Sequence, residues 1–328
     1  MIKDLNPDLK GNHSPKIEAA IKSLVSRGFK LSDQAERPYR FTIAVFEKGG
    51  QKFFVKIAEK GVVEFKFLRA EVWCNQIFQE LLADFSNPPP VKIPKVLDQN
   101  ESSDIYWVMF EFFAGERIAD WVPSRDPRSL KDWFPQIVDF VQFLEVVDPE
   151  KLETIEEVRS DVSVAEKMLA KINKWSAIPL KKGLISQDEL KVAIDLVGEL
   201  GDGLEYRLQH GDFVPWHMHD LGFPFFGLVD SEHGGVNQPQ YYDLAYFYHR
   251  LYTKLWQPQL ARDFLSLYLR SSNANREKFL KKFLPVIVQR TIGGFWDYSQ
   301  SSEEKREFGL HSDLLKRVLS KDLDKLIN

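Results

Sequence analysis

Three short stretches of this sequence decide its interpretation. They are Leu208-Gln-His-Gly-Asp212-Phe-Val-Pro-Trp-His217-Met, Gly227-Leu-Val-Asp230-Ser-Glu232 and Pro239-Gln-Tyr-Tyr-Asp243-Leu-Ala245. The second stretch is an apolar run that ends on an aspartate. Between Asp212 and Asp230 the chain carries Pro224 and glycines at 222 and 227. Such punctuation favours a β-hairpin that brings a loop and a strand end together.

Two aspartates in this arrangement suit phosphoryl transfer. That reaction needs little covalent help from the protein but close positioning, with a metal bridging phosphate oxygens and a carboxylate receiving the acceptor hydroxyl. Asp212 and Asp230 could supply these two roles. Taken alone, either aspartate would more often cap a helix or a turn, so the hypothesis depends on the three stretches occurring in this order within residues 210–245.

Upstream of these stretches the pattern predicts a β-hairpin with a lysine near its end. Apolar residues alternate over 41–45 and over 53–57, and Lys48-Gly49-Gly50 separates the two runs. Lys56 lies among the apolar residues of the second strand. A lysine buried in a strand needs a carboxylate or phosphate partner. The alternative is a solvated Lys56 on an edge strand.

The remaining pattern is that of a small β-rich part followed by a large helical part. Helical spacing occurs at 14–28 and about 62–85, and a further β-rich stretch covers 105–113. Past Gly115 the apolar spacing is mostly helical. The predicted helices there are near 134–144, 153–173, 187–200, 240–256 and 275–290.

Composition excludes several classes of partner. The 328 residues are 44% hydrophobic, and 44 basic against 48 acidic residues give a net charge of -4 without long blocks of either sign. We therefore expect neither nucleic acid nor a membrane as a partner. A single cysteine, Cys74, and the lack of an apolar signal or a long apolar run favour a cytoplasmic protein.

The three stretches closely resemble the catalytic loop, the metal-binding strand end and the following helix start of the aminoglycoside phosphotransferase and choline kinase family. The resemblance implies an α+β, bilobal protein-kinase-like fold with a small antiparallel-sheet N-lobe and a large mostly helical C-lobe. We expect the nucleotide-binding lobe and its hinge in residues 1–115, and the catalytic loop and acceptor site in residues 116–328.

The same resemblance implies a small-molecule kinase that uses ATP and Mg²⁺ to phosphorylate a hydroxyl. Asp212 would be the catalytic carboxylate and Asp230 the magnesium ligand. His210 would pack the loop, and Asp243 would accept hydrogen bonds from it. Glu232 is a secondary candidate for the metal, with a solvated strand end as the alternative.

Two further segments resemble parts of the nucleotide site. Phe53-Phe-Val-Lys56 is similar to the kinase strand whose lysine holds the α and β phosphates, and Glu71 is similar to its helix-borne partner, with Glu64 as a rival. Tyr106 to Gly115 resembles the hinge between lobes. The resemblance implies that the backbone of Glu111, Phe112 and Phe113 meets the adenine edge.

The sequence departs from the family at two places. His217 stands where the family's loop carries a metal-binding asparagine, and imidazole suits magnesium less well than oxygen does. We therefore keep His217 as a catalytic or metal-site candidate, able to donate to a phosphate, beside the alternative of loop packing. The segment 32–40 contains no glycine to close on phosphates, so Arg37 or Arg40 could contact them instead.

The acceptor is not predicted by the sequence. Aromatic residues are dense near the C-terminal part, and they fit either packed helices or a box that binds a cation: Tyr241, Tyr242, Tyr246, Trp256, Phe295, Trp296 and Tyr298. A second hypothesis is a nucleotide-binding or scaffold protein that has lost turnover, which the two departures favour. A histidine-based metal hydrolase is weaker, because none of the four histidines of residues 208–238 form an i, i+4 pair on a recognisable helix.

Overall fold

A computed structural model describes residues 14–32, 41–61, 64–120, 128–300 and 305–327, so Arg37 and Arg40 lie outside the described residues. In chain order its helices and strands are α1 Pro15–Ser26, β1 Lys30–Leu31, β2 Thr42–Lys48, β3 Gln51–Glu59, α2 Glu64–Asp84, β4 Val91–Lys92, β5 Val96–Glu101, β6 Ile105–Glu111, α3 Arg128–Asp132, α4 Phe134–Val146, α5 Val164–Lys181, α6 Gln187–Leu200, β7 Tyr206–Gln209, β8 Met218–Asp220, β9 Phe226–Leu228, β10 Gly235–Pro239, α7 Tyr242–Thr253, α8 Pro258–Ser271, α9 Arg276–Gln300, α10 Lys305–Leu319 and α11 Asp324–Ile327.

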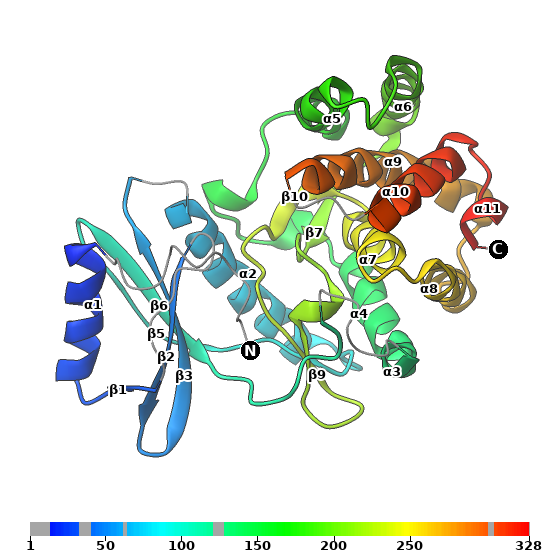
Figure 1. Cartoon of the computed structure of the whole chain (residues 1–328). Helices are drawn as coiled ribbons and strands as arrows, with labels where there is room; N and C mark the ends of the chain where they lie inside the picture. The colour runs from blue at the N-terminus through cyan, green and yellow to red at the C-terminus, as the bar shows by residue number, and fades with distance from the viewer. Residues whose placement is uncertain (1–13, 33–40, 62–63, 121–127, 301–304, 328) are drawn as a thin grey trace.

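The N-terminal part is an antiparallel sheet in the order β1-β2-β3-β6-β5, with α1 along one face and α2 beside the other (Figure 1). Alternation along β3 decides which side chains meet which helix. Val55 and Ile57 belong to the apolar cluster that includes α1, whereas Ala58 belongs to the cluster that includes Leu68 of α2. Lys56, between Val55 and Ile57, therefore points to the α2 face.

The C-terminal part is mostly helical and is built around α7. Every residue of α7 is buried, and α8, α9 and α10 all pack against it (Figure 1). The prediction of a small sheet-containing lobe followed by a large helical lobe is therefore confirmed. None of the helices in the described ranges is both long and apolar enough to cross a membrane.

Two small sheets hold residues 206–239, which include Asp212 and Asp230. β7 pairs antiparallel with β10, and β8 pairs antiparallel with β9, which also pairs in parallel with β4. The β8–β9 hairpin confirms the turn predicted between Asp212 and Asp230. The chain leaving β6 reaches the hairpin directly, because the Ile118 amide donates to the Met218 carbonyl at 2.9 Å.

One predicted helix was wrong in its bounds. Residues near 153–163 form only a short 3₁₀ turn, Glu156–Val158, and α5 begins at Val164 rather than near 153. The cause is local, since the Ser163 side chain accepts from the Glu166 amide while the Glu166 carboxylate accepts from the Ser163 amide. This capping box fixes the helix start. Helices α8 and α10 lie outside the predicted ranges altogether.

The packing of α9 against α7 and α10 gives a stability prediction. A methyl group on Gly294 would lie 2.2 Å from His249 Nε2 and 2.7 Å from His311 Cε1, whereas one on Gly198 of α6 would meet nothing within 4 Å. Gly294→Ala should lower the free energy of unfolding by about 1 to 3 kcal/mol through overpacking. Gly198→Ala should raise it by about 0.5 to 1 kcal/mol, because alanine favours helices. Urea denaturation measures both, and equal effects at the two glycines would refute the packing described.

Candidate active site

Lys56 lies at the centre of the site and binds two carboxylates. Its Nζ donates to Glu71 at 2.9 Å (Oε1) and 2.7 Å (Oε2), and to Asp230 Oδ1 at 2.5 Å. Lys56 is 6% exposed and Glu71 is 3% exposed. The predicted pairing of Lys56 with Glu71, rather than with Glu64, is confirmed. Asp230 joins the pair from a segment 174 residues further along the chain.

The charges of this cluster support one another. Burial alone would disfavour a charged lysine, but the carboxylates of Asp230 and Glu71 outweigh it and raise the pKa of Lys56. Burial also raises the pKa of Glu71 to about 7, although Lys56 opposes this shift. For Asp230 the effect of burial is overcome by Lys56 and His217, which hold its pKa well below the usual range. Lys56 and Asp230 are therefore an ion pair at neutral pH.

Asp230 is also the most open member of this cluster. Its side chain is 30% exposed, against 7% for Lys56 and 4% for Glu71. Its φ of 71° is in the left-handed region, which costs a residue with a Cβ about 1 kcal/mol or more. The next residue, Ser231, donates to Asn75 Oδ1 at 2.9 Å. Because Asn75 lies one turn after Glu71, α2 holds both the partner of Lys56 and the segment that carries Asp230.

The loop that carries Asp212 is fixed to α7 by Asp243. The Asp243 carboxylate accepts from the His210 amide at 2.5 Å and from the Gly211 amide at 2.9 Å. Burial raises the pKa of Asp243 to about 7 despite these donors. At Gly211, φ is +82° and a Cβ would lie 2.1 Å from the His233 carbonyl oxygen, so only glycine fits. His210 is buried against Phe78, as expected for a packing residue.

His217 lies between the two aspartates. Its Nε2 is 3.3 Å from Asp230 Oδ2, and its Nδ1 is 3.7 Å from Asp212 Oδ2 and 3.0 Å from the Asp212 carbonyl oxygen. The short turn Pro215–His217 brings the ring there, and the Val229 amide donates to the His217 carbonyl at 3.0 Å. The imidazole thus faces the position between both carboxylates rather than the protein core.

The donor atoms of this site can accommodate a hard cation. One ligand atom from each of Asp212, His217 and Asp230 lies within 4.8 Å of the others, and the same holds for Glu71, Asp230 and Glu232. Glu232 is only 9% exposed, so the alternative of a solvated strand end is wrong. Magnesium is commonly held by one or two carboxylates together with water and substrate phosphates. The two aspartates fit that requirement, whereas the imidazole nitrogen is a poorer ligand for magnesium.

The predicted hinge follows the end of β6 at Glu111. The Glu111 amide donates to the Lys95 carbonyl at 2.9 Å, so this N–H is already used. From Glu111 the backbone continues through Phe112 and Phe113 toward the β8–β9 hairpin. The Phe113 ring fills the space beside Gly227, where a Cβ would lie 2.5 Å from the ring.

A group of charged residues on α7 and α9 was not predicted from the sequence. Arg250 of α7 and Arg290 of α9 lie over the Tyr246 ring, at 4.7 and 4.0 Å from its centroid. The aromatic box considered from the sequence therefore contacts the chain's own guanidinium groups. The i, i+4, i+8 spacing of Tyr242, Tyr246 and Arg250 was the available signal, but nothing in the sequence pairs it with α9.

Comparison with solved structures supports the same fold. An aminoglycoside phosphotransferase, APH(2″)-IIia, in complex with GDP and kanamycin, has a TM-score of 0.63 and 12% identity over 93% of this chain and 99% of that chain. A thermostable mutant of APH(4)-Ia with ADP and hygromycin B has a TM-score of 0.60 and 10% identity over 92% and 97%. A putative fructosamine-3-kinase from Haemophilus somnus 129PT has a TM-score of 0.55 and 14% identity over 88% and 92%.

Comparison at the level of sequence gives the family. No curated protein sequence matches the chain. The model of the phosphotransferase enzyme family matches residues 35–280, which include Lys56, Glu71, Asp212 and Asp230. This match covers well over half of the 328 residues. The chain therefore belongs to the phosphotransferase enzyme family.

Proposed function

We propose that this chain transfers the γ-phosphate of ATP to a hydroxyl group of a small molecule. The observation that carries the proposal is the ion pair of Lys56 with both Glu71 and Asp230, next to Asp212 and His217. Two structural neighbours from the aminoglycoside phosphotransferases support it, since one was solved with ADP and hygromycin B and another with GDP and kanamycin. In this proposal residues 1–115 bind the nucleotide, and residues 116–328 supply the catalytic loop and the acceptor site.

We assign the nucleotide contacts to the N-terminal lobe. Lys56 is fixed by Glu71, and the N–H that it donates to Asp230 would turn to the α and β phosphates when Asp230 binds magnesium. The adenine edge would meet the Glu111 carbonyl and the backbone of Phe112 and Phe113. The Glu111 amide is excluded from this role by its bond to Lys95.

The transfer step requires a positioned acceptor and a proton acceptor. Asp212 orients the hydroxyl and receives its proton as the acceptor oxygen forms a bond to the γ-phosphorus. The bond from that phosphorus to the bridging oxygen breaks, and the bridging oxygen leaves with the electron pair as part of ADP. Magnesium held by Asp230, with Glu232 nearby, would neutralise charge on the phosphate oxygens. His217 can donate a hydrogen bond to the transferring phosphate.

A second candidate function is nucleotide binding without transfer. The position of the His217 ring between Asp212 and Asp230 favours it, because a nitrogen donor stands at the place where magnesium prefers oxygen. ATP binding without ADP release in the presence of any hydroxyl acceptor would select this function.

Asp212→Asn tests the catalytic assignment. The amide keeps the size of the side chain but cannot take up the proton, so turnover should fall by roughly 10² to 10⁴ while ATP affinity stays nearly unchanged. Turnover is measured with an acceptor found in a screen of amino alcohols, aminoglycosides, sugars and nucleosides. The exposed Asp202→Asn is the matched control and should behave as the parent. Equal turnover in the Asp212 variant and the parent would remove Asp212 from the catalytic role.

His217→Asn separates the two candidate functions. If the chain is a kinase that relies mainly on Asp230 for magnesium, the substitution supplies an oxygen ligand and should preserve or raise turnover with magnesium. If the chain only binds nucleotide, the parent turns over no acceptor and the variant gains at most slow ATP hydrolysis. A parent that is fast with magnesium and a variant that is inactive would contradict both, and would give the imidazole an essential role.

A further inference from the structure

Four cationic side chains gather between α5, α7 and α9, and we call them the basic cluster: Lys167, Lys171, Arg250 and Arg290. The two arginines are 7% and 5% exposed, which is unusual for this residue type. The two lysines are half-buried on α5. The basic cluster therefore needs an explanation in terms of its anionic partners.

The arginines share a single carboxylate. Arg250 Nη2 donates to Asp297 Oδ2 at 2.6 Å, and Arg290 Nη2 is 3.8 Å from the same oxygen. Arg250 Nη2 also donates to the Tyr246 hydroxyl at 2.8 Å. Three guanidinium nitrogens, Nε and Nη1 of Arg250 and Nε of Arg290, are buried and have no hydrogen-bond partner among the described residues.

Among the described residues the two lysines have neutral partners only. Lys171 Nζ donates to Gln238 Oε1 at 2.9 Å, and Lys167 Nζ donates to the Asn237 carbonyl at 2.5 Å. Burial, followed by the like charges of Lys167 and Arg290, lowers the pKa of Lys171 to about 7. An oxyanion beside Lys171 would restore its full charge.

The basic cluster thus has four cationic groups but one carboxylate partner among the described residues. Within the described part of the chain, Asp297 alone lies within ion-pairing distance of any member of the basic cluster. Buried charges in proteins are normally paired, and leaving a guanidinium without acceptors is costly. Guanidinium groups match carboxylate and phosphate oxygens in a fixed fork geometry. The excess positive charge therefore favours an oxyanion from outside the chain.

The basic cluster adjoins the catalytic loop. Tyr242, Tyr246 and Arg250 occur at i, i+4 and i+8 on α7, the helix whose Asp243 binds the loop backbone. The Arg250 Cα is about 12 Å along the helix from that of Tyr242 at 1.5 Å per residue, and helical side chains lean toward the N-terminus, which shortens the span. Burial raises the pKa of both tyrosines, and the Asp212 charge adds to this shift, as expected for nearby groups.

We propose that the acceptor carries an oxyanion, a carboxylate or a phosphate, which binds to the basic cluster while its hydroxyl faces Asp212. This inference rests on the proposed function and narrows its substrate class. Arg290 and Lys171 are then specificity-determining residues. The Trp175 ring forms an apolar wall beside them, with its centroid 5.5 Å from Arg290 Cζ and 5.6 Å from Lys171 Nζ. Neutral and cationic hydroxyl compounds bind poorly because they leave the excess positive charge unpaired.

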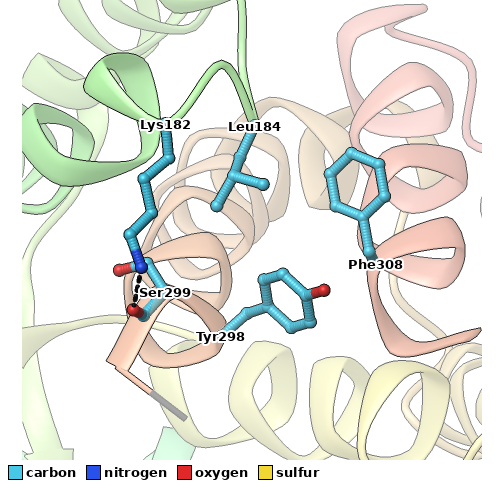
Figure 2. A pocket seen from close by; sticks show the side chains of 5 residues that line it. All are labelled: Lys182, Leu184, Tyr298, Ser299 and Phe308. Atoms are coloured by element: carbon cyan, nitrogen blue, oxygen red, sulfur yellow. Dashed lines mark hydrogen bonds between the residues drawn. The ribbon is translucent and has the colours of Figure 1, made fainter. Parts of the chain in front are cut away.

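Lys182, which lines a cavity beside the end of α9, provides a control for the loss of one positive charge. The cavity has a volume of about 350 Å³ and is lined by Lys182, Leu184, Tyr298, Ser299 and Phe308 (Figure 2). Lys182 Nζ donates to the Ser299 carbonyl at 2.8 Å, so its ammonium group is satisfied by the end of α9. Lys182 is an exposed lysine that contacts α9 outside the basic cluster. Lys182→Gln removes one positive charge without changing the proposed acceptor site.

The experiment compares neutral acceptors with close counterparts that carry an oxyanion. ATP-dependent phosphorylation is measured with glycerol against glycerate and glycerol 3-phosphate, with galactose against galacturonate and galactose 6-phosphate, and with choline as a cation. The carboxylate and phosphate arms distinguish the two kinds of oxyanion. In parallel, calorimetry measures binding of inorganic phosphate while ADP and magnesium saturate the nucleotide site.

We expect an oxyanion-bearing acceptor to exceed its neutral counterpart at least tenfold in kcat/KM. Lys171→Gln and Arg290→Gln should raise the KM for that acceptor roughly tenfold, equivalent to about 1.4 kcal/mol, with kcat and the KM for ATP unchanged. Arg290→Lys keeps the charge in case the glutamine variant does not fold, and should lose less. Lys182→Gln should behave as the parent.

The other outcomes separate this inference from the proposed function. Preference for neutral or cationic acceptors would overturn the inference and leave the kinase proposal intact. Saturable phosphate binding that Lys171→Gln weakens, without turnover of any acceptor, would support the oxyanion site and contradict the kinase proposal. Absence of both phosphate binding and oxyanion preference would overturn the inference.

Discussion

A lysine ammonium group cannot be buried without anionic partners, and the arrangement of the site follows from burying Lys56. Strand alternation turns Lys56 toward α2, where Glu71 supplies one carboxylate. Asp230 supplies the second at 2.5 Å. Removing one partner from such a buried pair typically costs about 3 to 5 kcal/mol, so the pair links the sheet, α2 and the segment after β9. Asn75 and Ser231 strengthen the same connection by a hydrogen bond.

A second constraint comes from α7, which holds the loop that carries Asp212. Asp243 in its first turn accepts two amide hydrogen bonds from the loop, and Gly211 permits the close approach of the turn that precedes β10. The same helix carries Tyr246 and Arg250 toward α9. One buried helix thus positions Asp212, the proposed catalytic carboxylate, and the basic cluster together. This common support gives a physical reason why acceptor charge and catalytic geometry would be matched.

The sequence was most informative where a rule of local geometry applied. The apolar residues that flank Lys56 indicated a lysine in need of a carboxylate or phosphate, whereas its pairing with Glu71 was predicted from the family resemblance. Pro224 with its neighbouring glycines predicted the β8–β9 hairpin. Helix bounds were predicted less well, because the capping box at Ser163 decides where α5 begins. The pairing of Arg250 with Asp297 could not be predicted, since it depends on how α7 packs on α9. Helical periodicity identifies a buried face but does not say which other face it meets.

The central claim is that Lys56 and its carboxylates form a site for nucleotide phosphates with magnesium. Calorimetric titration with ATP, with and without magnesium, tests this claim in the parent, in Lys56→Met and in the exposed control Lys30→Met. Thermal unfolding first establishes that the Lys56 variant is folded. We predict that magnesium tightens ATP binding in the parent and in Lys30→Met, and that Lys56→Met weakens it at least roughly tenfold, equivalent to about 1.4 kcal/mol. Equal ATP affinity in the folded Lys56 variant and the parent would contradict the account.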